Sequence, residues 1–148
     1  MKKIDRSKAG TPFKAYFNLD KPDHFVWVRV YKNRKSMCAA VSRTMGSTYG
    51  SGYAGLCMAY RLFKFPKGSK RALASKELGT IFLNYDEARA AVVTHECLHA
   101  VAAYAKLKRL NLCRTGVKAG LMSPKCDQER LCYALGDLVY QIGQKVWD

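Results

Sequence analysis

The sequence predicts an α+β fold in which two long helices cover one side of a small antiparallel sheet. Short segments rich in β-branched and aromatic residues fall within residues 25–84. Two long segments with helical apolar spacing fall within residues 85–148. Strands followed by helices, rather than alternating with them, favour separate layers. The length of 148 residues suits a single domain over residues 1–148, in which residues 1–24 are predicted to be an irregular basic arm.

Four segments of residues 25–84 are candidate strands. The clearest is 25–32, because FVWVRVYK alternates along its length and is rich in β-branched and aromatic residues. A turn at NRKS separates it from a second, shorter candidate at 37–43, MCAAVSR. The third candidate is 56–65, and the fourth is the short apolar segment 80–84. These four segments make up the predicted sheet.

The segments around the strands contain turn signals. Residues 46–55, GSTYGSGYAG, predict a loop because Gly and Ser dominate them. Residues 66–79 predict a connection that holds a helical turn. Within the arm, a short element is expected near residues 13–19, between the turn signals GTPF and DKPDH.

The first predicted helix covers residues 85–107. Asn84 and Glu87 match a capping pattern, and the acidic side chains near this end suit the helix dipole. Strong helix formers fill the segment, and the basic residues Lys106, Lys108 and Arg109 end it.

The last helix is predicted to start at Ser123, after a linker over residues 109–122. Ser123 is a suitable N-cap, and Pro124 suits the first helical position. Helical spacing marks the expected core face: Leu131, Leu135, Leu138 and Ile142.

The charge of the chain favours polyanionic partners. There are 26 Lys and Arg residues against 11 Asp and Glu, a formal net charge of +15. Such a field attracts nucleic acid and other polyanions. The basic residues are scattered, so a basic soluble surface without a dedicated partner is the alternative interpretation. No apolar run could cross a membrane and no signal peptide is recognisable at the N-terminus, so we expect a cytoplasmic protein without membrane association.

The six cysteines form no C-x-x-C pair, and several lie inside apolar segments. In a cytoplasmic protein they are expected to be reduced and to pack as small apolar residues.

The stretch VVTHECLHAV contains the motif H-E-x-x-H, formed by His95, Glu96 and His99. On a helix, residues four apart point the same way, so both imidazoles can bind one Zn²⁺. Glu96 lies about 100° around the helix from His95. A carboxylate on that flank is placed to act as a general base rather than as a third ligand.

A catalytic zinc site needs a third protein ligand. We predict Glu129, at the start of the last helix, where the small residues Cys132 and Gly136 would share its face and allow close approach. Asp127 is the alternative ligand, and Cys126 is a weaker one. A solvated carboxylate at a helix start is the alternative interpretation of Glu129.

These features resemble zincin-type metallopeptidases. The resemblance covers residues 79–140 and rests on the strand GTIFLN, on HECLHA and on the later helix with ERLCYALGDLV. The compact phage and bacterial domains of the ImmA/IrrE type look most similar. SprT-like proteases are a more distant likeness, because they use a third histidine downstream and this chain has none after His99.

The resemblance implies a mechanism and two further features of the site. In such enzymes Glu96 would take a proton from water and pass it to the leaving amine of a peptide substrate, and GTIFLN would be an edge strand that binds an extended peptide. Tyr133 would help to hold the oxyanion, with Tyr49 and Tyr53 as alternatives. Cys97, beside the base, is expected to be a packing residue.

Two classes of function therefore follow from the sequence. The first is a zinc-dependent metallopeptidase. The alternative is a nucleic-acid-associated or phage-type regulatory protein that uses a zincin-like fold without proteolysis. A closed structural zinc site would need a fourth protein ligand, which the sequence does not offer in an obvious place.

Overall fold

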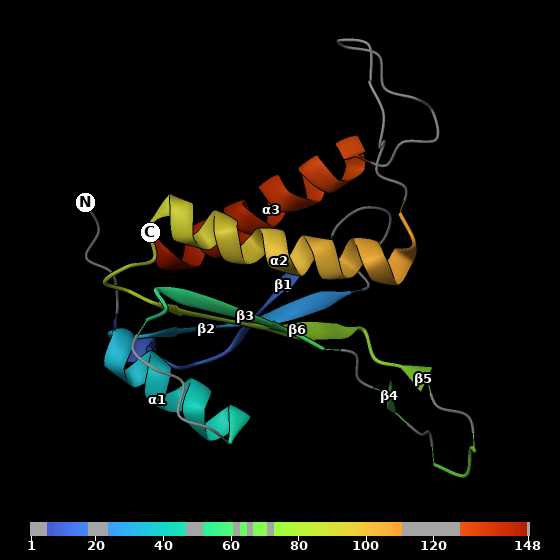
Figure 1. Ribbon diagram of the computed structural model, residues 1–148, viewed down its shortest axis with the longest axis horizontal. Helices are drawn as coiled ribbons and strands as arrows, with labels where there is room; N and C mark the ends of the chain where they lie inside the picture. Colours follow the sequence, from blue (N-terminus) through green and yellow to red (C-terminus); the bar gives the residue numbers. More distant parts are fainter. Residues whose placement is uncertain are drawn as a thin grey trace.

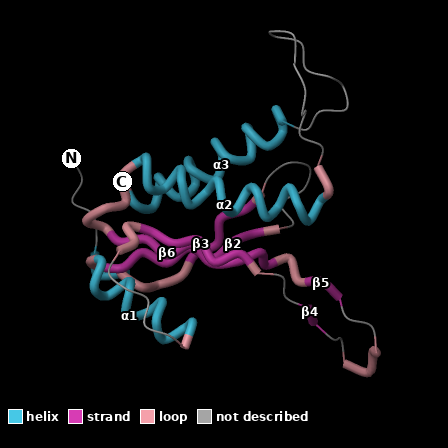
Figure 2. The backbone as a smooth tube through the Cα atoms, in the orientation of Figure 1, coloured by secondary structure: helices cyan, strands magenta, loops and turns pink. Residues whose placement is uncertain are grey.

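A computed structural model describes residues 6–17, 24–46, 52–60, 63–64, 67–70, 73–110 and 128–147 of the chain. The fold is α+β, with a four-stranded sheet between helices (Figures 1 and 2). In chain order the elements are η1 (Arg6–Lys8), β1 (Phe13–Tyr16), β2 (Phe25–Tyr31), α1 (Arg34–Met45), β3 (Gly55–Ala59), β4 (Phe63–Lys64), β5 (Leu73–Ala74), β6 (Glu77–Asn84), α2 (Ala90–Lys108) and α3 (Gln128–Val146).

The sheet is mixed, with strand order β1-β2-β6-β3, so the prediction of an antiparallel sheet is wrong. β2 pairs with β6 in parallel, with Val28 opposite Ile81, while β1 and β3 pair antiparallel with their neighbours. Parallel neighbours need a crossover connection between them. Here the chain crosses one face of the sheet as α1 before it returns through β3 to β6.

Helix α1 replaces the turn and strand predicted over residues 33–43. Asn33 caps this helix, because its side-chain oxygen accepts a hydrogen bond from the Ser36 N–H at 2.9 Å. Gly46 ends it in the left-handed conformation, with φ of 67°. Met37 and Val41 share one face and pack with Phe82 of β6.

Helices cover both faces of the sheet: the two long helices lie on one side, as expected, and the additional helix α1 lies on the other. Helices α2 and α3 pack on one face and α1 packs on the other (Figure 1). The alternation of β2 explains this arrangement. Val26, Val28 and Val30 are buried toward α2 and α3, whereas Trp27 and Tyr31 point to the side of α1.

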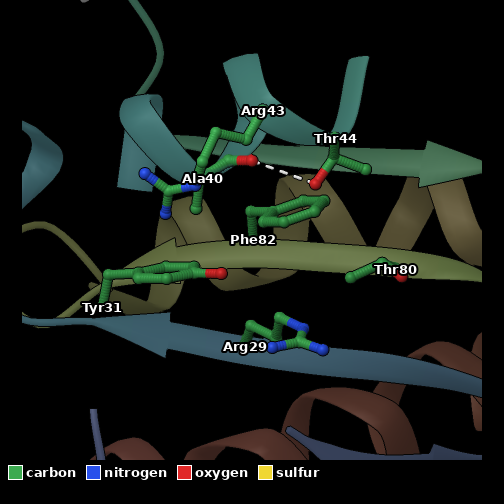
Figure 3. A pocket seen from close by; sticks show the side chains of 7 residues that line it. All are labelled: Arg29, Tyr31, Ala40, Arg43, Thr44, Thr80 and Phe82. Atoms are coloured by element: carbon green, nitrogen blue, oxygen red, sulfur yellow. Dashed lines mark hydrogen bonds between the residues drawn. The ribbon is translucent and has the colours of Figure 1, made fainter. Parts of the chain in front are cut away.

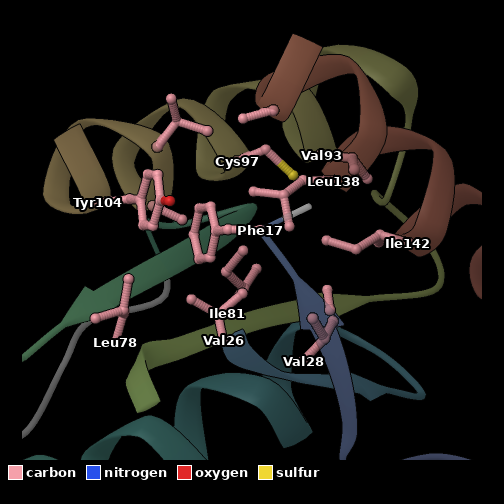
Figure 4. Close-up of a cluster of buried hydrophobic side chains, with 14 of the residues drawn as sticks. Phe17, Val26, Val28, Leu78, Ile81, Val93, Cys97, Tyr104, Leu138 and Ile142 are labelled. Atoms are coloured by element: carbon pink, nitrogen blue, oxygen red, sulfur yellow. The ribbon is translucent and has the colours of Figure 1, made fainter. Parts of the chain in front are cut away.

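The main core lies between the sheet and the helix pair α2–α3 (Figure 4). Leu138 and Ile142 of α3 are fully buried in it, as their helical spacing predicted. The rings of Phe17 and Tyr104 stack in the same layer, with centroids 4.6 Å apart. Cys97 is fully buried there as well, which confirms that it is a packing residue.

Helix α2 starts at Ala90, five residues later than predicted. The predicted capping contact nevertheless forms, because the Asn84 side-chain oxygen accepts a hydrogen bond from the Glu87 N–H at 3.1 Å. This hydrogen bond closes a turn that precedes α2, and it does not cap the helix. The Asn84 amide also donates to the Ala54 carbonyl at 2.9 Å, and so ties the ends of β6 and β3 together.

Helix α3 returns antiparallel to α2. At its end, the Trp147 indole N–H donates to the Ala88 carbonyl, just before α2, at 2.6 Å. Gln141 hydrogen-bonds with both the N–H and the carbonyl of Tyr16, so α3 covers one edge of the sheet at β1. Residues 123–127, where this helix was predicted to begin, lie outside the described residues.

The connection over residues 66–79 contains strand β5, which pairs with β4 and occupies part of the segment expected to hold a helical turn. Among the described helices, none has the length and apolar character needed to cross a membrane.

Candidate metal centre

His95 and His99 lie one turn apart on the exposed side of α2. Their Nε2 atoms are 3.2 Å apart, and their ring centroids are 4.9 Å apart. Both residues are exposed. The helix therefore brings the two imidazoles together, as the spacing of four predicts.

The separation of the two nitrogens fits two ligands of one zinc ion. Nitrogens that each lie about 2.0–2.1 Å from a tetrahedral Zn²⁺ are roughly 3.3 Å from one another. The same separation suits a hydrogen bond between two neutral rings, with one Nε2 protonated and the other accepting. The two states differ by the exchange of a proton for a metal ion.

Glu96 lies beside this pair but is buried, with 6% of its surface exposed. Burial raises the pKa of its carboxyl above the ordinary value. His95, His99 and the backbone N–H of Cys57 act in the opposite direction and favour the carboxylate. The carboxyl is thus held between the imidazole pair and strand β3.

Gly55 makes this position of Glu96 sterically possible. A Cβ atom at Gly55 would lie 3.0 Å from the Cγ of Glu96 and 3.0 Å from the Cγ1 of Val92. Helix α2 therefore packs directly against the backbone of β3 at this point. Gly55 lies in the segment 46–55 that was predicted as a loop. Because that segment is rich in glycine, its composition gave no reason to single out Gly55.

Strand β3 is the edge strand next to the motif. The prediction that GTIFLN is an edge strand is wrong, because β6 contains these residues and lies between β2 and β3. The Tyr60 N–H donates to the Leu78 carbonyl, and antiparallel pairing alternates along a strand. The backbone groups of Cys57 therefore point away from β6, which agrees with the hydrogen bond from Cys57 to Glu96.

A hollow of about 630 Å³ continues the seam between α2 and β3 toward the end of α2. On α2, Ala103 is one turn beyond His99, so the hollow begins about 6 Å along the helix axis from that histidine. Apolar and basic residues make up its wall: Ala59, Tyr60, Leu78, Ala103, Lys106, Leu107 and Arg109.

Glu129 is placed away from the histidines. It is exposed and precedes the fully buried Leu138 by nine residues, which is about half a turn around α3. Cys132 is exposed and a Cβ at Gly136 would meet nothing within 4 Å, so the expected close approach on this face does not occur. Within the described ranges, no three His, Cys, Asp or Glu side chains gather as a metal site.

Of the remaining candidate residues, the structure describes two. Tyr133 and Tyr53 are exposed, by 71% and 46% respectively. Tyr133 is five residues before Leu138, so it too points away from the core side of α3. Tyr49, Cys126 and Asp127 lie outside the described residues.

Neither of the two described cysteines beside Glu96 is activated as a thiolate. Burial raises the pKa of Cys57 and of Cys97 to about 12, so both thiols are protonated at neutral pH. The described cysteines, Cys38, Cys57, Cys97 and Cys132, are all free.

Comparisons of the chain with protein-family models, with curated proteins and with solved structures gave no match.

Proposed function

We propose that the protein is a zinc-dependent metallopeptidase in which His95 and His99 bind the metal and Glu96 is the general base. The observation that carries this proposal is the 3.2 Å separation of the two imidazole Nε2 atoms, which suits two ligands of one tetrahedral ion. The buried carboxyl of Glu96 lies beside them and can act as a general base, which a purely structural metal site would not need.

The environment of Glu96 supports proton transfer. A base is most effective when its pKa lies near the working pH, and burial shifts the pKa of Glu96 upward, in that direction. Glu96 would accept a proton from the attacking water and pass it to the leaving amine. Zinc at the pair would supply a Lewis acid that polarises the scissile carbonyl.

The position of β3 supports an extended peptide as the substrate. Its outward backbone groups other than the Cys57 N–H, which donates to Glu96, can pair with an added strand, whereas the opposite edge of the sheet is occupied by Gln141. A peptide on β3 would pass beside Glu96 and reach the hollow near Ala103. With Lys106 and Arg109 on its wall, the hollow favours a substrate side chain that has an apolar stem and an acidic end.

Three residues remain candidates for the third protein ligand. Glu129 is the first. Its side chain is exposed on α3, so it would have to turn toward α2 to reach the metal. Asp127 and Cys126, just before the described part of α3, are the alternatives. Alanine variants of the three can be compared by their zinc content.

The test measures zinc content and peptide hydrolysis in the same protein preparations. We expect about one zinc per chain, loss of zinc in His95→Ala and His99→Ala, and loss of hydrolysis with retained zinc in Glu96→Gln. Leu98→Ala is the matched control, because Leu98 is exposed on the same helix and occupies one of the two variable positions of the motif. Absence of zinc from the native protein, or full hydrolysis by Glu96→Gln, would contradict the proposal.

A further inference from the structure

The described residues cover the face of the sheet opposite the histidines only in part. Helix α1 packs over the end of β2, where Tyr31 and Phe82 contact its core (Figure 1). Five side chains project from β1 and β2 on this same face: Lys14, Tyr16, Phe25, Trp27 and Arg29. We refer to these five residues as the open sheet face.

The open sheet face combines aromatic rings with cations. Tyr16 and Phe25 are directly opposite each other, with ring centroids 5.9 Å apart, and Phe25 lies 5.6 Å from Trp27. The Lys14 ammonium lies 4.4 Å from the centroid of Phe25 and 5.2 Å from that of Trp27. The three rings are half-buried rather than packed into either core cluster.

A pocket of about 380 Å³ adjoins this face beneath α1 (Figure 3). Arg29 and Arg43 line it from the sheet and the helix, together with the hydroxyl groups of Tyr31, Thr44 and Thr80. No acidic side chain is among the described residues that line it. The guanidinium groups and the Tyr31 hydroxyl are donors suited to phosphate oxygens, whereas the Thr44 hydroxyl already donates to the Ala40 carbonyl at 2.9 Å.

We propose that the open sheet face and this pocket bind single-stranded nucleic acid. Half-buried rings on a sheet can stack with unpaired bases, which a duplex would keep stacked on one another. Lys14, Arg29 and Arg43 can pair with the phosphates, and the net charge of +15 attracts the polyanion. This proposal does not depend on peptidase activity, because the two sites lie on opposite faces of the sheet.

The test is the anisotropy of a fluorescein-labelled 12-nucleotide thymidine or uridine strand, titrated with the full chain at several salt concentrations. Trp27→Leu removes a stacking ring but keeps an apolar side chain, and we expect it to weaken binding by about fivefold to a hundredfold. Lys14→Glu/Arg43→Glu should weaken binding as well, and should lower the salt slope by about 0.7 for each phosphate that no longer pairs with a cation.

Lys108→Glu/Lys145→Glu is the matched control. It changes the net charge by the same amount as Lys14→Glu/Arg43→Glu, at exposed positions on α2 and α3. We expect it to bind the strand clearly more tightly than the other double variant. Equal weakening by the two pairs would mean that only the overall charge matters, and would overturn the proposal.

Two further measurements distinguish single-stranded nucleic acid from other possible occupants of the open sheet face. A 12-base-pair duplex and inorganic polyphosphate should compete more weakly than the single strand, and equal competition would overturn the proposal. Sedimentation should give the same mass for the native chain and the Lys14→Glu/Arg43→Glu variant. A native dimer that this variant dissociates would assign the face to a second copy of the chain instead. Because Lys14 and Arg43 are exposed, this variant decides the matter even if Trp27→Leu fails to fold.

Discussion

The α-carbon of Gly55 lies so close to α2 that a methyl group there would stand 3.0 Å from the Cγ of Glu96. This contact connects the edge strand to the proposed general base through van der Waals packing. Leu83 of β6 would also lie within 3.2 Å of the added methyl group. An alanine at this position therefore has to displace α2, β6 or the Glu96 side chain.

We predict that Gly55→Ala lowers kcat of peptide hydrolysis by about tenfold and leaves the zinc content unchanged. Displacement of a catalytic group by much less than 1 Å has an effect of this order, since about 1 Å can cost a hundredfold. Steady-state kinetics and metal analysis on the same sample measure the two quantities. Gly136→Ala is the control, because a Cβ there meets nothing within 4 Å, and it should stabilise α3 by about 1 kcal/mol. Equal kcat values for Gly55→Ala and the native chain would contradict the role of this contact.

The buried carboxyl of Glu96 predicts that Glu96→Gln stabilises the protein after zinc is removed with a chelator. The raised pKa means that, above the ordinary value of 4.5, the unfolded state releases this proton before the folded state does. Stability therefore falls as the pH rises through that window, and it stays lower above the window. Thermal unfolding should show a higher Tm for Glu96→Gln at pH 8, and a difference that shrinks toward pH 4. A lower Tm for Glu96→Gln at pH 8 would contradict this prediction, because it would mean that the folded state stabilises the Glu96 carboxylate.

The sequence predicted the two long helices and the strongest strand because each shows its own periodicity. It failed for α1, whose apolar residues Met37, Ala40 and Val41 follow helical rather than alternating spacing. Asn33 and Gly46 were also recognisable helix ends. The parallel pairing of β2 with β6 could not be read from either strand, because strand direction depends on the path of the intervening chain.

At the site, the histidine pair was predictable and its surroundings were not. A spacing of four on one helix fixes the direction of His95 and His99 without help from other elements. The contact of Glu96 with Gly55 and Cys57 depends on which strand lies at the edge of the sheet, and this is decided by pairing over long range. The exposure of Glu129 could have been anticipated, since it lies opposite the apolar stripe that ends at Ile142.

The ion pair between Arg34 and Glu87 predicts a stability difference that depends on pH. The Arg34 guanidinium, followed by the Asn84 amide, holds the pKa of the Glu87 carboxyl below its ordinary value. The Arg34 Nε donates to Glu87 Oε2 at 2.7 Å, so the start of α1 is tied to the turn before α2. The stabilisation is present above the pKa of unfolded glutamate and is lost as the pH falls through the lowered folded value.

We expect Arg34→Ala to lower Tm at pH 7, and the difference from the native chain to disappear as the pH falls below the lowered folded pKa, once Glu87 is protonated in both states. Lys35→Ala is the control, because Lys35 is the exposed neighbour of Arg34 on the same helix and should change Tm little at either pH. The measurement is thermal unfolding by circular dichroism at a series of pH values. Because the pair is partly exposed, with 39% and 30% of the two side chains accessible, added salt should weaken its effect at pH 7. A Tm difference that is independent of both pH and salt would mean that Arg34 acts through packing of its side-chain stem and not through its charge.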